Sequence, residues 1–116
     1  MGVPMALGYL PLLLAGLAGA SWADAETVNV EQRGAVDLTP FLCQDITRSS
    51  LVNRVCYDAA NQTMIVQMSS VYSQYCDVPH AIRDRFLNAP SMGQYFNANI
   101  KGIGAEAPYQ CRPREF

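Results

Sequence analysis

Four cysteines are the residues of this chain whose type and spacing could most readily do chemistry. They are separated by 12, 19 and 34 residues along the sequence: Cys43, Cys56, Cys76 and Cys111. Zinc sites usually take their ligands from close pairs such as Cys-x-x-Cys, and this sequence contains no such pair. In an oxidising compartment, cysteines spaced in this way form disulfides. The spacing therefore predicts two structural disulfides and no metal site.

Three pairings of the four cysteines exist. Cys56 and Cys76 are expected on the first and third strands of a meander, roughly 9–10 Å apart. Since a disulfide joins Cα atoms separated by less than about 7 Å, we disfavour Cys56–Cys76 together with Cys43–Cys111. Two pairings stay open: Cys43–Cys56 with Cys76–Cys111, and Cys43–Cys76 with Cys56–Cys111.

The remaining candidates for chemistry have simpler structural interpretations. His80 is the sole histidine and is expected in the exposed first turn of a helix, where no unbonded cysteine would accompany it as a nucleophile. Asp58 is expected in a turn, Asp77 at a helix start and Asp84 on an exposed helix face. We therefore expect no catalytic, metal-binding or cofactor-binding residue, no cofactor, and no enzymatic activity.

A binding surface is the alternative use for the polar and aromatic residues. Arginines could supply positive charge beside a tyrosine that stacks on a ligand. The residues that we predict for such an interaction surface are Arg54, Tyr75, Arg83 and Arg85. Asn61-Gln62-Thr63 is in addition a glycosylation sequon in an expected turn, which matters only where the host attaches glycans.

The first 25 residues have the composition of an export signal. There is no charged side chain from Met1 to Ala23, and small residues allow cleavage near residues 23–25. An uncleaved membrane anchor is the rival interpretation, because a span of this length could cross a bilayer. We predict a cleaved signal peptide over residues 1–25, no membrane span afterwards, and a secreted or periplasmic protein.

The charge of the chain bears on its partners. The sequence has 8 Lys and Arg residues against 10 Asp and Glu, a net charge of −2. Proteins that neutralise phosphates usually carry a basic excess, so charge and export both disfavour nucleic acid as the partner. The mature chain of roughly 91–93 residues is enough for one domain, which disulfides would help to stabilise.

The elements that must position these residues are strands followed by helices. Residues 26–48 are expected to form an irregular arm that Cys43 ties to the core. Alternating apolar residues predict antiparallel strands over 51–57, 64–68 and 71–76. Two helices should cover one face of this three-stranded meander: one begins near Pro79, and the other begins at a Ser91–Gln94 capping box and ends at Gly102. Residues 103–116 form a tail that holds Cys111. The fold class is therefore α+β.

Several of these residues together resemble the KTSC domain. The resemblance is carried by Ser49-Ser50-Leu51-Val52, Tyr57-Asp58, Val78-Pro79, Ser91-Met92-Gly93-Gln94-Tyr95-Phe96-Asn97 and Ile100-Lys101-Gly102, and implies a KTSC-like domain over residues 49–102. The family is named for its place at the C-terminus of some lysyl-tRNA synthetases, and its biochemical role is unknown. Its Tyr-x-Tyr motif is altered here, because Ser73 precedes Tyr75 where the first tyrosine is expected. Tyr72 should point to the opposite face.

Three functions remain after these arguments. The first is a non-catalytic interaction module that acts outside the cytoplasm on an unknown partner, expected to be a protein. The second, which the resemblance to a synthetase appendage implies, is RNA binding through basic and aromatic surface residues. The third is a small enzyme or an enzyme inhibitor, since an inhibitor needs only a rigid loop. The sequence favours the first.

Overall fold

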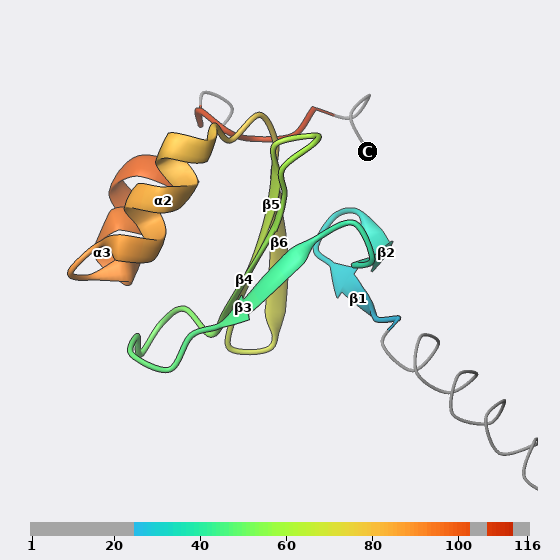
Figure 1. Ribbon diagram of the computed structural model, residues 1–116, viewed down its shortest axis with the longest axis horizontal. Coiled ribbons are helices and arrows are strands. Elements are labelled where there is room, and N and C mark those ends of the chain that lie inside the picture. The colour runs from blue at the N-terminus through green and yellow to red at the C-terminus, as the bar shows by residue number, and fades with distance from the viewer. Residues whose placement is uncertain (1–24, 103–106, 113–116) are drawn as a thin grey trace, which may run out of the picture.

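The computed structural model describes residues 25–102 and 107–112. A six-stranded sheet with the strand order β2-β1-β6-β5-β4-β3 forms the centre of the molecule (Figure 1). The strands are β1 (Thr27–Val30), β2 (Gly34–Asp37), β3 (Leu42–Asp45), β4 (Arg54–Asp58), β5 (Thr63–Met68) and β6 (Val71–Tyr75). The helices are α2 (His80–Asn88) and α3 (Met92–Tyr95), which continues as a π-helix (Phe96–Lys101). The α+β class is confirmed.

The expected meander lies at the middle of this sheet. β4, β5 and β6 are consecutive and antiparallel, with Val55 opposite Val66 and Val66 opposite Ser73. The first strand of the meander, β4, begins at Arg54 and not at Leu51 as expected. Asp58 forms the turn as expected, because its Oδ1 accepts hydrogen bonds from the backbone N–H groups of Ala60 and Asn61.

The prediction of only three strands was wrong, because residues 26–48 are not an irregular arm. β1 and β2 form an antiparallel hairpin with Val28 opposite Val36, and its turn places Gln32 and Gly34 at positive φ. β1 joins the meander through one parallel pair, Val30 with Tyr72. β3 pairs with β4 along its whole length, so the chain contributes strands to both sides of the meander.

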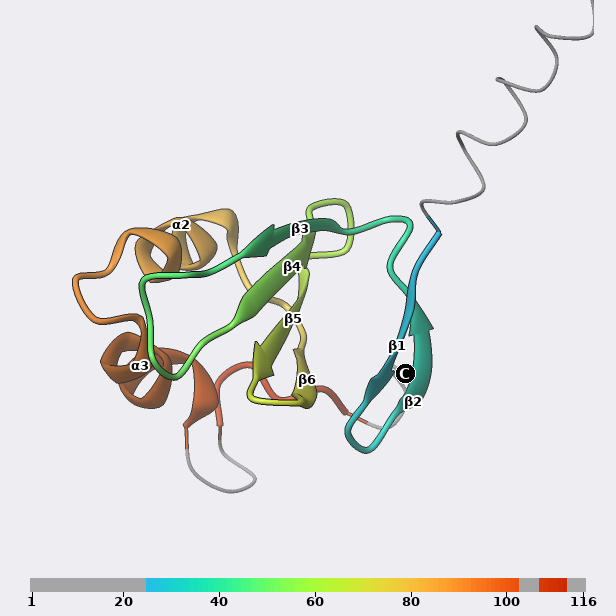
Figure 2. The ribbon, with the colours of Figure 1, turned by 90° about the horizontal axis from the view of Figure 1, so that it is seen from below.

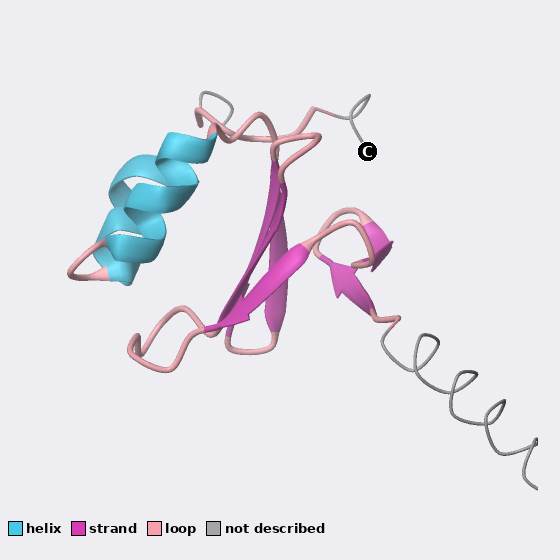
Figure 3. Cartoon of the chain, in the orientation of Figure 1, coloured by secondary structure: helices cyan, strands magenta, loops and turns pink. Residues whose placement is uncertain are grey.

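The central sheet lies between the helices on one side and the β1–β2 hairpin on the other (Figures 1 and 3). It buries apolar side chains on both of its faces. On one face the helices cover a core that includes Val55, Met64, Val66, Phe86 and Phe96. On the other face the β1–β2 hairpin buries the smaller cluster Val28, Val30, Val36, Leu38, Cys56 and Ile65. The hairpin therefore does for the second face what the helices do for the first, since each removes apolar surface from water.

The start and end signals of the second helix are confirmed, whereas Asp77 precedes α2 without capping it. Ser91 Oγ accepts a hydrogen bond from the Gln94 N–H at 3.3 Å, and Met92, Phe96 and Ile100 are buried at four-residue spacing. Gly102 ends the π-helix with φ +63°. A Cβ there would lie 2.7 Å from Pro108 Cδ, so glycine is needed both for the backbone conformation and for the close approach of the tail.

Two disulfides join all four cysteines. Cys43 bonds to Cys56 across β3 and β4, and Cys76 bonds to Cys111. This is one of the two pairings that the sequence left open, and the disfavoured Cys56–Cys76 bond does not form. Cys76 N–H also donates to Tyr109 O at 2.8 Å, so the described part of the tail lies beside the end of β6.

The expected signal peptide lies outside the described residues, apart from Ala25. Within residues 25–102 and 107–112, no helix is both long and apolar enough to cross a bilayer.

Candidate functional site

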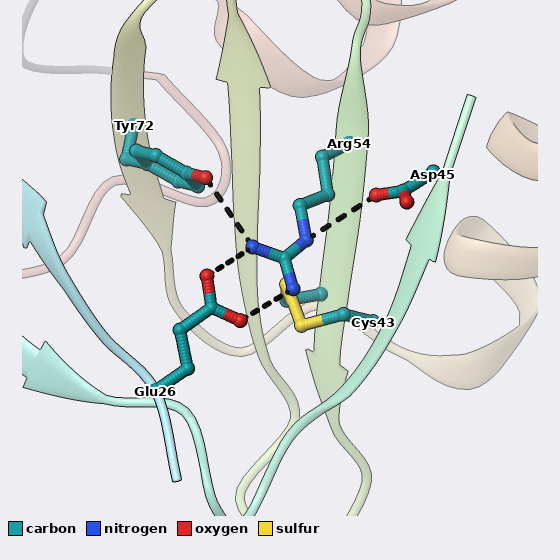
Figure 4. Close-up of polar contacts among 6 residues, drawn as sticks. Glu26, Cys43, Asp45, Arg54 and Tyr72 are labelled. Atoms are coloured by element: carbon teal, nitrogen blue, oxygen red, sulfur yellow. Dashed lines mark hydrogen bonds and ion pairs between the residues drawn. A yellow bond between two sulfur atoms is a disulfide. The ribbon is translucent and has the colours of Figure 1, made fainter. Parts of the chain in front are cut away.

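Arg54 lies at the centre of a polar cluster on the face of the sheet that the hairpin covers (Figure 4). Its two terminal nitrogens each donate to one oxygen of Glu26 at 2.7 Å. Nη1 also lies 3.3 Å from the Tyr72 hydroxyl, and Nε lies 3.5 Å from Asp45 Oδ1. Such a two-point contact fixes the planar guanidinium strongly. The cluster therefore ties the start of β1 to β3, β4 and β6.

The electrostatics of this cluster favour the charged forms of both partners. The hydrogen bonds from Arg54 hold the pKa of Glu26 below its ordinary value of 4.5. The same contact raises the pKa of Arg54 above its already high value. Because Glu26 takes up both terminal nitrogens, the guanidinium is committed to holding the N-terminal strand in place.

A second cluster lies on the opposite face, around Tyr57. The Tyr57 hydroxyl donates to Val78 O at 2.6 Å, and His80 meets the ring edge-to-face at 5.5 Å. The Arg83 guanidinium carbon lies 4.7 Å from the ring centroid, a favourable cation–π distance. Burial raises the pKa of Tyr57. These contacts fix the start of α2 on β4, so His80 has a packing role.

Tyr75 packs within the fold. Its ring meets Phe96 edge-to-face at 5.6 Å, and burial raises the pKa of its hydroxyl. Arg85 is exposed in the last turn of α2. Tyr72 contributes to the hairpin-side cluster and Tyr75 to the helix-side core, so these two tyrosines point to opposite faces as expected.

The four residues of the predicted interaction surface therefore do not meet. Arg54 is on the hairpin side of the sheet, whereas Tyr75 and Arg83 contact groups on the helix side. Of the four, Arg83 and Arg85 share α2, and Arg83 also forms an ion pair with Asp84 at 2.8 Å. The contacts of Arg54, Tyr75 and Arg83 thus hold the fold together.

A polar groove of about 570 Å³ lies between the β2 region and the adjoining ends of β5 and β6. Its lining includes Asp37, Asp58, Asp77 and Gln74. Asp58 Oδ2 accepts from the Asn61 side chain at 2.9 Å, and Asp37 Oδ1 accepts from Thr39 Oγ1 at 2.7 Å. Among the described residues, no three metal-ligating side chains gather in one place. Asp37 and Asp58 thus stabilise their own turns.

The outer edge of β3 is the feature that the sequence did not indicate. All four residues of β3 are exposed, and Leu42 retains 82% of its accessible surface. β3 ends the strand order, so β4 is its one strand neighbour in the part of the chain described (Figure 2). Leu42 follows Phe41 directly, so the sequence here has no alternation of apolar and polar residues that would indicate a strand.

Two of the segments that resemble a known family, Ser49–Val52 and the run that begins at Ser91, meet where α3 begins. Ser49 Oγ accepts from the N–H groups of Leu51 and Val52, and a Cβ on Gly93 would lie 3.1 Å from Leu51 Cδ2. Ser91 starts α3 beside them. Residues 48–103 match the KTSC domain.

A solved structure agrees with this match. The KTSC domain protein from Yersinia pestis superposes with a TM-score of 0.53 at 29% sequence identity. The alignment covers 62% of this chain and 94% of the Yersinia chain. Among curated proteins, none matches the sequence. The link to lysyl-tRNA synthetases stays a prediction. Within the matched residues 48–103 (the KTSC segment), Ser49, Ser91 and Gly93 lie at the junction between the strand region and α3.

Proposed function

We propose that this KTSC-containing protein is an exported, non-catalytic module that binds another protein through the outer edge of β3. The observation that carries the proposal is an edge strand with an 82% exposed leucine, Leu42, which a disulfide fixes to the sheet. An edge strand offers unpaired backbone groups to another strand. A rigid edge also loses less conformational entropy on binding than a mobile one.

The two disulfides support the location outside the cytoplasm. They include every cysteine of the chain, and disulfides persist mainly in oxidising compartments. The apolar residues before Ala23 fit a signal for export. Secretion or transfer to the periplasm is therefore the location that we propose.

The roles of the polar residues support a module without catalysis. The cysteines are bonded to one another, Asp58 caps its own turn, and the Tyr57 hydroxyl is occupied by Val78 O. Each group contributes to holding the fold, whereas a general base or nucleophile must reach a substrate.

RNA binding has less support from the geometry. The KTSC segment has five basic and three acidic side chains, a net charge of +2. The preceding residues 25–47 have four acidic side chains and one basic, and Glu26 neutralises Arg54. Tyr75 packs against Phe96, so its ring would have to give up this contact before an RNA base could stack on it. Salt-dependent RNA binding that Arg83→Ala weakens would favour this alternative.

A photo-crosslinking amino acid placed at position 42 tests the proposed binding surface in the producing cell. Position 71 is the matched control, because Val71 is also an exposed apolar residue, at 45%, but lies at a hairpin turn. We expect covalent protein adducts from position 42 and few from position 71. Equal labelling at both positions, or none at position 42, would contradict the proposal.

A further inference from the structure

The outer side of β3 presents the backbone of alternate residues. Ile46 N–H donates to Asn53 O at 2.9 Å, and Cys43 and Cys56 form a close pair with a Cα separation of 3.9 Å. In an antiparallel ladder the close pairs are those without hydrogen bonds between the two strands. The ladder bonds to β4 therefore belong to Leu42, Gln44 and Ile46, and the backbone groups of Cys43 and Asp45 point to the outer edge.

The side chains of β3 divide between the two faces. Leu42 and Gln44 lie opposite Tyr57 and Val55, which belong to the helix-side core, and residues directly opposite each other share a face. Ile46 packs partly against the same core. An apolar residue, an amide and a second apolar residue thus follow one another on the helix side.

From this pattern we propose that β3 pairs antiparallel with β3 of a second copy, about a two-fold axis at Gln44. This inference rests on the proposed function and names its partner. Cys43 of each copy then exchanges backbone hydrogen bonds with Asp45 of the other, which are the residues whose backbone groups point outward. Leu42 lies opposite Ile46 of the second copy, and Gln44 lies opposite Gln44. The exposed surface of Leu42 is covered by apolar surface.

Charge and polarity favour this register over the two registers that are shifted by one residue. An axis at Asp45 would place two carboxylates directly opposite each other, which is unfavourable. An axis at Cys43 would place Leu42 opposite an amide, Gln44. With the axis at Gln44, the Asp45 of the second copy lies opposite Cys43, and no two charged side chains face each other directly. The ladder is self-complementary, as a two-fold interface requires.

The interface is small, so the dimer is weak. β3 has four residues, and contacts of this size fall below those of stable complexes. We expect a dissociation constant between about 1 µM and 1 mM. Leu42→Asp should weaken the dimer at least about tenfold and leave the monomer folded, because that side chain is exposed. Val71→Asp is the matched control and should leave dimerisation unchanged.

Sedimentation velocity of the purified, oxidised protein over a concentration series measures this association. Gln44→Cys gives a second readout, because two cysteines facing each other in a close pair can form a disulfide. We expect a covalent dimer from Gln44→Cys, little from Val71→Cys, and its loss when Leu42→Asp is added. A strictly monomeric protein up to 1 mM, or equal crosslinking of both cysteine variants, would overturn the inference.

The composition of photo-adducts at position 42 distinguishes self-pairing of β3 from the more general proposal that this edge binds a protein. Adducts composed of two copies of this chain support both. Adducts with a different protein alone, together with a monomeric purified protein, leave the proposed function in place and overturn self-pairing. An absence of adducts contradicts both.

Discussion

The Cys43–Cys56 disulfide should hold β3 on the sheet. It closes a segment of 13 residues in sequence separation, and the loop-entropy relation gives about 3 kcal/mol for a loop of this length. Replacing both cysteines with alanine should lower the free energy of unfolding by about that amount, with a small addition because Cys56 is buried. This is a large part of the stability of about 5–15 kcal/mol that is usual for single domains.

Urea unfolding of the Cys43→Ala/Cys56→Ala variant measures the global cost. Amide hydrogen exchange measures the local one, because Ile46 N–H donates to Asn53 O and should exchange much faster once β3 is released. The matched control is Cys76→Ala/Cys111→Ala, which removes the other disulfide, at the end of β6. This variant should lower the stability of the domain, but the amides that pair β3 with β4 should stay protected from exchange relative to the rest of the chain.

Two results would refute this reasoning. The first is a loss of less than about 1 kcal/mol, well under the loop-closure value. The second is unchanged exchange of the Ile46 amide in the Cys43→Ala/Cys56→Ala variant. Either result would mean that backbone pairing and the contacts of Arg54 hold β3 without the disulfide.

Three other perturbations test the packing and electrostatics. Glu26→Gln should destabilise the fold by about 0.5–1 kcal/mol at pH 7, a discounted value because Glu26 is 45% exposed. Since Arg54 lowers the pKa of Glu26 below its ordinary value of 4.5, the difference in stability from the unmodified protein should be fully present above that ordinary value and disappear as the pH falls through the folded pKa. A difference independent of pH from about 2 to 7 would contradict this. Phe86→Ala removes a fully buried ring that packs on Phe96 and should cost about 3–5 kcal/mol in thermal or urea unfolding, with Phe86→Leu less costly. Ser91→Ala should cost about 0.5–2 kcal/mol through loss of the helix cap, and Ser91→Asp should restore most of it.

The elements that could be predicted from the sequence are those in which apolar residues recur at a regular spacing over several positions. Met64 and Val66 lie two residues apart on one face of β5, and Met92, Phe96 and Ile100 recur every four positions. Local chemistry placed the turn at Asp58 and the cap at Ser91. Each signal lies within a few residues of the element that it specifies, so it could be found without knowledge of the fold.

The N-terminal strands could not be predicted because distant contacts stabilise them. β1 and β2 have four residues each, and the alternation of Val28 and Val30 is too short to distinguish a strand from an arm. The parallel contact of Val30 with Tyr72 joins residues 42 positions apart. β3 is exposed along its whole length and gives no alternation. Without β3 beside β4, the choice of Cys43–Cys56 could not be made.

The candidate site was predicted only in part for the same reason. Arg54 was named from its residue type, but its partner Glu26 is 28 residues earlier in the chain. Arg83 was placed correctly on a helix, whereas its position over the Tyr57 ring depends on how α2 packs on β4. Leu42 was missed because a single exposed leucine has no special meaning until the strand that carries it is known to be an edge.

Mapping the disulfides in protein isolated from the producing cell tests the central claim most directly. The account predicts Cys43–Cys56 and Cys76–Cys111 in a non-reducing digest of protein recovered outside the cytoplasm, with the residues before position 24–26 removed. Recovery of the full-length chain from the cytoplasm with four titratable thiols, or a digest that joins Cys43 to Cys76, would contradict it.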